Sequence, residues 1–329
     1  MIQNEREAKT IATKSIETTK NADGQKILRA VKKELKKNGS LYLMAFIPFV
    51  FLILFHYWPM YGVQIAFKDY SVAKGFAGSP WVGLKHIQRF ISSPKFGLLM
   101  RNTLIIGLYG LATFPLPIIL ALMLNYLPFP RYKKLIQMVS YAPHFISTVV
   151  MVGIVLQILN KNNGLLNILI EALGGEAVNF MAKPTWFYHI YQWSGVWQGI
   201  GYSSIIYISA LSGVPQELHE AAIMDGATIL QRMWHIDIQS ILPTVCVLLI
   251  LSCGGILGVG YEKVYLLQNN LNLNYSEVIS TYVYKQGLTS TLPQFSYSTA
   301  IGLFSSLINV TLLLIVNKIV DKLSGNGFM

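Results

Sequence analysis

The segment ELHEAAIMDGATILQRMWHIDIQSILPT occupies residues 217–244 and lies between two long apolar runs. It carries too many charged and polar residues for a stretch that crosses a bilayer. Helix-forming residues around Ala221 lead to Gly226, where a helix can stop because glycine adopts a positive φ at little cost. A second helical pattern follows before Pro243. The sequence therefore predicts a short helix, a turn at Gly226 and a second helix, all held against the face of a membrane.

Long apolar runs surround this polar segment on both sides. There are six of them, at residues 41–60, 103–125, 138–159, 190–212, 244–261 and 297–317. A helix of about 20 residues spans the roughly 30 Å of hydrocarbon in a bilayer. None of the runs contains Asp, Glu, Lys or Arg, and only 12% of the 329 residues are charged, which is low for a soluble domain. The sequence thus predicts an all-α integral membrane protein with six transmembrane helices.

The basic residues indicate how these helices are oriented. The formal net charge is +11, but 10 of the 26 Lys and Arg residues precede residue 38. This clustering predicts a basic cytoplasmic tail over 1–40 in contact with anionic lipid, and no nucleic-acid partner is expected. With the tail inside, 16 basic residues are cytoplasmic and 10 are external. A transmembrane domain then occupies 41–329, with both termini and the loop 213–243 in the cytoplasm.

The polar segment also carries a family signature. The string EAAIMDGA at 220–227, followed by Ile236, resembles the EAA motif of permease subunits in binding-protein-dependent ABC importers. One departure is Ile238-Gln239, where the family usually has Leu-Pro, and it leaves the bend of the second helix open. The resemblance implies that the loop is a coupling helix that docks in a groove of a cytosolic ATPase. The residues implied in this contact are Glu217, Glu220, Ala221, Ala222, Asp225, Gly226 and Ala227. From the residues alone, the loop could also be an ordinary amphipathic interfacial helix.

Further segments are similar to the complex-carbohydrate branch of maltose-type permeases. They are PMYG at 59–62, IAFKDY at 65–70, WVGLK at 81–85, RNT at 101–103, SYAPHFIS at 140–147, GGI at 254–256 and YEKVYLL at 261–267. The resemblance extends from about residue 41 to the end and implies the type I ABC importer permease fold in a bacterial cytoplasmic membrane. It implies a second homologous permease, a cytosolic ABC ATPase dimer, an extracytoplasmic solute-binding protein and a sugar cargo, with oligosaccharide the expected one.

Missing motifs restrict the chemistry of the chain itself. No G-x-x-x-x-G-K-[ST] motif occurs, so there is no P-loop for ATP. The resemblance places ATP and Mg on the partner ATPase, with no cofactor on this chain. G-x-S-x-G, H-E-x-x-H and D-x-D are also absent, which favours a transport subunit over an enzyme. Two alternatives stay open: a permease for a peptide, amino acid or other polar solute, and a membrane enzyme of envelope carbohydrate metabolism.

The fourth apolar run offers a candidate path for a sugar. The candidate residues along this path are Trp193, Trp197, Gly201 and Ser204. They are spaced by four, four and three residues and so share one face of a helix. Indole rings stack on the C–H faces of sugars, and hydroxyl groups orient them. The alternative for the tryptophans is an interfacial aromatic belt, since Trp193 lies near the outer boundary. An unpaired charge is costly in hydrocarbon, so the charge-free runs predict a neutral cargo.

Overall fold

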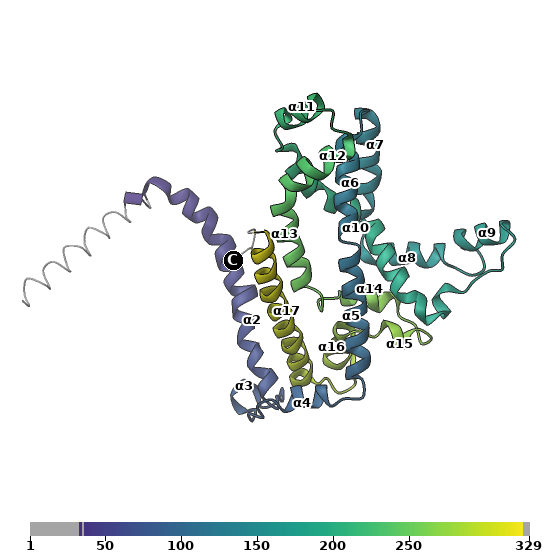
Figure 1. Ribbon diagram of the computed structural model, residues 1–329. Coiled ribbons are helices and arrows are strands. Elements are labelled where there is room, and N and C mark those ends of the chain that lie inside the picture. The colour runs from purple at the N-terminus through teal and green to yellow at the C-terminus, as the bar shows by residue number, and fades with distance from the viewer. Residues whose placement is uncertain (1–32, 35, 325–329) are drawn as a thin grey trace, which may run out of the picture. The chain divides into compact units, whose positions relative to one another are not determined.

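The computed structural model describes residues 33–34 and 36–324, which divide into two units after Gln64. Every described element is a helix, apart from one isolated antiparallel bridge between Lys68 and Trp81 (Figure 1). Of the tail predicted over 1–40, residues 1–32 and 35 lie outside the described residues.

The first described span is a helix that begins at Lys36 and continues to Phe67. It contains a π-helical turn, a short α-helix and a 3₁₀ segment: η1 (Ile53–Tyr57), α2 (Trp58–Met60) and η2 (Tyr61–Phe67). Its large apolar side chains, from Leu41 to Tyr61, are exposed. An apolar surface of this kind suits a membrane, because lipid tails solvate apolar side chains.

Fewer helices qualify as candidate spans than the six expected. Among the described residues, four helices are long and apolar enough to cross a membrane: Lys36–Phe67, Phe96–Tyr126, Ile229–Gly254 and Phe295–Lys322. A bent pair, Pro130–Phe145 and Thr148–Ile158, makes a fifth if its halves cross together. The helix at the fourth apolar run, α10 (Phe187–Ser212), has 26 residues but is too polar to count with them. The described chain is therefore an all-helical membrane protein with four or five candidate spans.

The single helix predicted over 138–159 is wrong. The structure has three helices there: α7 (Pro130–Tyr141), η3 (Ala142–Phe145) and α8 (Thr148–Ile158). The axis bends by 107° between η3 and α8. Ile146 and Ser147 are extended at the bend, and the Ser147 hydroxyl caps α8 by accepting a hydrogen bond from a backbone N–H. Pro143 lacks an amide hydrogen and further weakens the helix before the bend. Apolar content alone did not reveal this break.

The fifth apolar run also has different limits. The second helix of the polar loop was expected to be separate from a span over 244–261, but the two form one continuous helix, Ile229–Gly254. Its parts are α12 (Ile229–Arg232), η6 (Met233–Asp237) and α13 (Ile238–Gly254). Pro243 lies inside α13, and the π-helical turn η6 precedes it. The helix ends at the glycine-rich stretch 254–260, where backbone order costs more entropy.

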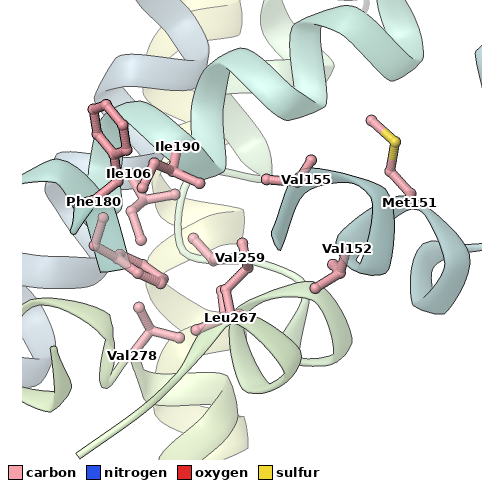
Figure 2. Close-up of a cluster of buried hydrophobic side chains, with 11 residues drawn as sticks. Ile106, Met151, Val152, Val155, Phe180, Ile190, Val259, Leu267 and Val278 are labelled. Carbon is pink, nitrogen blue, oxygen red and sulfur yellow. The ribbon is translucent and has the colours of Figure 1, made fainter. Parts of the chain in front are cut away.

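In the second unit, α10 packs against several helices that are distant in sequence. Its neighbours include α6 (Pro115–Tyr126), α7 and α13, while α17 (Phe295–Ser324) packs against α13 and α4 (Lys85–Ile91). Figure 2 shows a buried cluster in which side chains of α5 (Phe96–Ala112), α8 and α10 meet, among them Ile106, Val155 and Ile190. These contacts hold the bent segment against the bundle.

Shorter helices complete the second unit. They are α3 (Gly75–Gly78), α9 (Leu165–Ala172), η4 (Phe180–Ala182), η5 (Pro184–Trp186), α11 (Gln216–Met224), α14 (Tyr261–Leu267), α15 (Leu273–Ser276), α16 (Ile279–Tyr284) and η7 (Lys285–Thr289). Figure 1 shows α11 and α12 at the end of the bundle where α7 lies, with α4 and α16 at the opposite end. The polar loop therefore occupies one end of this unit.

Candidate coupling surface and solute path

The turn that follows α11 has the conformation predicted for Gly226. The φ of Gly226 is 78°, in the left-handed region. The Gly226 N–H donates to the Ile223 carbonyl at 3.0 Å, and the Ala227 N–H donates to the Ala222 carbonyl at 2.8 Å. These two bonds form a Schellman motif, which satisfies the last carbonyls of a helix. The prediction of a helix stop at Gly226 is confirmed.

The next helix begins with a capping box. The Thr228 N–H donates to Oε1 of Gln231 at 2.8 Å, and the Gln231 N–H donates to Oγ1 of Thr228 at 3.4 Å. This reciprocal pair satisfies two donors at a helix start. Only Ala227 and Thr228 separate the Gly226 turn from the long helix Ile229–Gly254. A link of two residues therefore joins the end of α11 to a helix that is long and apolar enough to cross a membrane.

The surface of α11 is exposed along its length, and no residue of the helix is buried. Three of its apolar side chains are exposed: Leu218 by 49%, Ile223 by 53% and Met224 by 86%. The carboxylates among the predicted coupling residues, Glu217, Glu220 and Asp225, are exposed beside them. A hollow of about 300 Å³ lies next to this surface and is lined by Ala222, Asp225, Gly226, Ala227, Gln231, Arg232, His235 and Ile236. Grouped exposed apolar side chains are typical of a surface that binds another protein.

A buried acid beneath α11 was missed by the sequence analysis. Asp237 is fully buried, and the hydroxyl of Tyr126 donates to its Oδ2 at 2.6 Å. Nε2 of His219 lies 3.3 Å from the other carboxylate oxygen, Oδ1, although the angle is not that of a hydrogen bond. The guanidinium of Arg232 lies over the Tyr126 ring, 5.5 Å from its centroid. These contacts connect the end of α6, the helix α11 and the start of Ile229–Gly254.

One signal in the sequence could have revealed this cluster. Asp237 stands among apolar residues just before the fifth run, and a buried carboxylate needs partners. The partners themselves were not predictable, because Tyr126 is 111 residues away.

The four predicted path residues fall into two different environments. Trp193 and Trp197 are 52% and 45% exposed and line a mainly apolar hollow of about 300 Å³ between α8 and α10. Gly201 and Ser204 are buried instead. A Cβ at Gly201 would clash with the backbone of Ser140 on α7, so this glycine permits a close approach of α7 and α10. The two halves of this predicted face therefore have different neighbours.

A second face of α10 lines a more polar hollow that the sequence analysis did not identify. This hollow of about 390 Å³ lies among α5, α6, α10 and α13, and its polar lining residues are Thr113, Gln192, Tyr202, Ser203, Tyr207 and Ser252. Nε2 of Gln192 donates to Oγ1 of Thr113 at 2.6 Å. A neighbouring hollow of about 410 Å³ shares Gly110, Gln192 and Ser252. Hydroxyl and amide groups that converge on a cavity suit a hydroxyl-rich solute.

Known proteins share this architecture and sequence. A family model described as "Binding-protein-dependent transport system inner membrane component" matches residues 113–325. The chain belongs to this family. This permease is 42% identical over 295 residues to the "Polygalacturonan/rhamnogalacturonan transport system permease protein YteP" of Bacillus subtilis, covering 89% of this chain and 91% of the relative. It is 41% identical over 294 residues to "Protein LplB" of the same organism, covering 89% and 92%.

The permease also matches solved structures over nearly its whole length. A chain from the crystal structure of a bacterial ABC transporter involved in the import of the acidic polysaccharide alginate aligns with a TM-score of 0.80 and 34% identity. The alignment covers 89% of this chain and 99% of that chain. A chain from the crystal structure of a bacterial alginate ABC transporter in complex with an alginate pentasaccharide-bound periplasmic protein aligns with a TM-score of 0.81.

These matches confirm the family that the EAA motif indicated. The chain is a permease subunit of an ABC importer and a multi-pass component of the inner membrane. It is a transport subunit and not an enzyme, so the alternative of a membrane enzyme is excluded. As a permease, it carries no cofactor of its own.

Proposed function

We propose that this permease imports an oligosaccharide as one of two homologous permease subunits, and that α11 couples it to a cytosolic ABC ATPase dimer. The exposed apolar surface of α11 carries the proposal, because Gly226 and Thr228 join it to the helix Ile229–Gly254. The coupling contact would use the seven residues named above, from Glu217 to Ala227. ATP and Mg bind the ATPase, and its closure moves α11 and tilts the spans.

The proposed membrane arrangement has six crossings. At about 1.5 Å per residue, the 26 residues of α10 extend about 39 Å, enough to cross. Gln192 and Ser203 line a hollow inside the unit, so its polar groups need not face lipid. With the bent pair α7–α8 as one crossing, the domain 41–329 has its loop 213–243 in the cytoplasm. Both termini, including the basic tail 1–40, then lie in the cytoplasm of a bacterium, where the tail contacts anionic lipid.

An oligosaccharide fits the comparisons better than a peptide or an amino acid. The relative YteP is named for polygalacturonan and rhamnogalacturonan transport, and the similar solved transporter imports alginate. The hydroxyl and amide groups in the lining of the 390 Å³ hollow suit such cargo. A periplasmic protein holds the pentasaccharide in the related complex, and we propose an extracytoplasmic solute-binding protein as the partner here too.

Cysteine labelling tests the proposed orientation. Cys246 and Cys253 are buried and leave a low background. Met224→Cys and Leu173→Cys place thiols at positions that are 86% and 88% exposed. In intact cells, a membrane-impermeant maleimide should label Leu173→Cys only, and permeabilisation should add Met224→Cys. Labelling of Met224→Cys from outside would overturn the orientation and the coupling role together.

Uptake by the complete importer tests the proposed cargo. Cells that contain both permeases, the ATPase and the binding protein should take up labelled oligosaccharides, and deletion of this permease should abolish the uptake. We propose that Trp193 and Trp197 stack on sugar rings, so Trp197→Ala should lower uptake about fivefold, for a stacking loss of about 1 kcal/mol. Val149→Ala, exposed on α8 but outside that hollow, is the matched control. Uptake of peptides without any oligosaccharide would refute the cargo assignment.

A further inference from the structure

Lys263 places an amine against the inner surface of α10. It lies on α14, and its Nζ donates to the carbonyl oxygen of Tyr191 at 3.0 Å. The same Nζ lies 4.9 Å from the centroid of the Tyr191 ring. Gly195, one turn further along α10, leaves room for it, because a Cβ there would lie only 3.1 Å from the Nζ. The amine therefore rests on α10 between Tyr191 and Gly195.

No carboxylate pairs with this amine in the part of the chain that the structure describes. Glu262, its neighbour in sequence, is exposed and is not a member of any ion pair among the described residues. The Tyr191 carbonyl accepts one hydrogen bond, whereas an ammonium group can donate three. Burial lowers the pKa of Lys263 to about 8. That pKa is still above 7, so most of the amine is charged at neutral pH.

The two α10 residues beside the Lys263 amine each line one of the two neighbouring hollows. Gly195 lines the 390 Å³ hollow, and Tyr191 lines the neighbouring 410 Å³ hollow. None of the residues that line either hollow is Asp, Glu, Lys or Arg. Lys263 thus adds a positive charge beside surfaces on which hydroxyl and amide groups lie among apolar side chains. Such a site complements a solute with many hydroxyl groups and a carboxylate.

We propose that Lys263 binds the carboxylate of an acidic sugar, such as a uronic acid residue, as the oligosaccharide passes α10. The inference rests on the proposed import of an oligosaccharide and names its chemical class. It reverses the expectation of a neutral cargo, which considered only the apolar runs. Lys263 follows the fifth run in sequence, but α14 folds back so that its amine lies against α10.

Two substitutions separate the charge of Lys263 from its hydrogen bond. Lys263→Gln keeps a donor for the Tyr191 carbonyl but removes the charge, while Lys263→Arg keeps the charge. The complete importer in proteoliposomes would be measured with trigalacturonate and with its neutral methyl ester. For trigalacturonate, Lys263→Gln should lower the uptake rate at limiting concentration about tenfold or more, because a hydrogen bond to a charged group is lost. Lys263→Arg should retain most of it, and uptake of the methyl ester should be equal in all three proteins.

The outcomes separate the proposed role of Lys263 from the proposed import of an oligosaccharide. If the wild-type importer takes up trigalacturonate and Lys263→Gln does so equally well, Lys263 does not bind the carboxylate, but sugar import stands. Equal losses in both variants and for both trisaccharides would assign Lys263 a purely structural role and overturn the inference. Uptake of the ester but not the acid by the wild type would also overturn it. If neither trisaccharide nor any other glycan enters, the import proposal itself fails.

Discussion

Gly226→Val should leave the permease in the membrane in normal amounts but reduce uptake about tenfold. The φ of Gly226 is 78°, and a Cβ added there would meet nothing within 4 Å. The effect therefore comes from backbone conformation alone. Left-handed backbone costs an L-residue about 1–2 kcal/mol, and a β-branched side chain tolerates it least. The turn should reopen, and α11 should lose its fixed orientation to Ile229–Gly254. ATPase co-purification and labelled-sugar uptake measure the two consequences.

Gly226→Asn is the matched control for this change. Asparagine adds a side chain of similar size to valine but adopts the left-handed region more readily. It should keep most of the ATPase binding and uptake. A Gly226→Val complex with full substrate-stimulated ATPase activity and normal uptake would show that this turn does not couple the subunits.

Asp237→Leu should destabilise the permease and also disconnect α11 from the spans. Asp237 is fully buried, with Tyr126 and His219 against its two oxygens. Leucine at this position leaves the Tyr126 hydroxyl without its acceptor, and an unsatisfied buried donor costs about 1–3 kcal/mol. We expect a clearly lower melting temperature of the purified complex and a loss of uptake beyond that explained by protein amount. Differential scanning fluorimetry and uptake normalised to membrane-inserted protein measure these effects.

Two further variants show how much of the destabilisation comes from the hydrogen bond to Asp237. Tyr126→Phe removes only the hydrogen bond to the carboxylate and should cost about 1–3 kcal/mol. Glu171→Gln removes an exposed carboxylate on α9 and should change stability by less than about 0.5 kcal/mol. If Asp237→Leu melts at the wild-type temperature, the buried cluster does not stabilise the junction between α6, α11 and Ile229–Gly254.

Local sequence predicted several features of this permease correctly. The helix stop at Gly226 was predictable because a Schellman turn depends on residues within one helical turn of the glycine. The EAA string indicated the family, which the match over 113–325 confirms. The apolar runs indicated helices because backbone groups in a lipid environment must pair within the helix.

Only the tertiary structure determined where those helices bend and what their polar residues meet. Hydropathy in 138–159 is continuous, yet the helix bends by 107°, because the Ser147 cap and the packing of α8 decide the local geometry. The sequence placed Trp193 and Ser204 on one face, but Trp193 is 52% exposed whereas Ser204 is fully buried.

The partners of Asp237 and Lys263 depended on tertiary structure even more strongly. The hydrogen bond from Tyr126 to Asp237 joins residues 111 positions apart, and that from Lys263 to Tyr191 joins residues 72 positions apart. Helical periodicity records which side of a helix is apolar, but it holds no information on which distant segment covers that side. Whether an acid or an amine stabilises the fold or binds a solute depends on how deeply it is buried and which group it contacts. The packing of distant segments determines both.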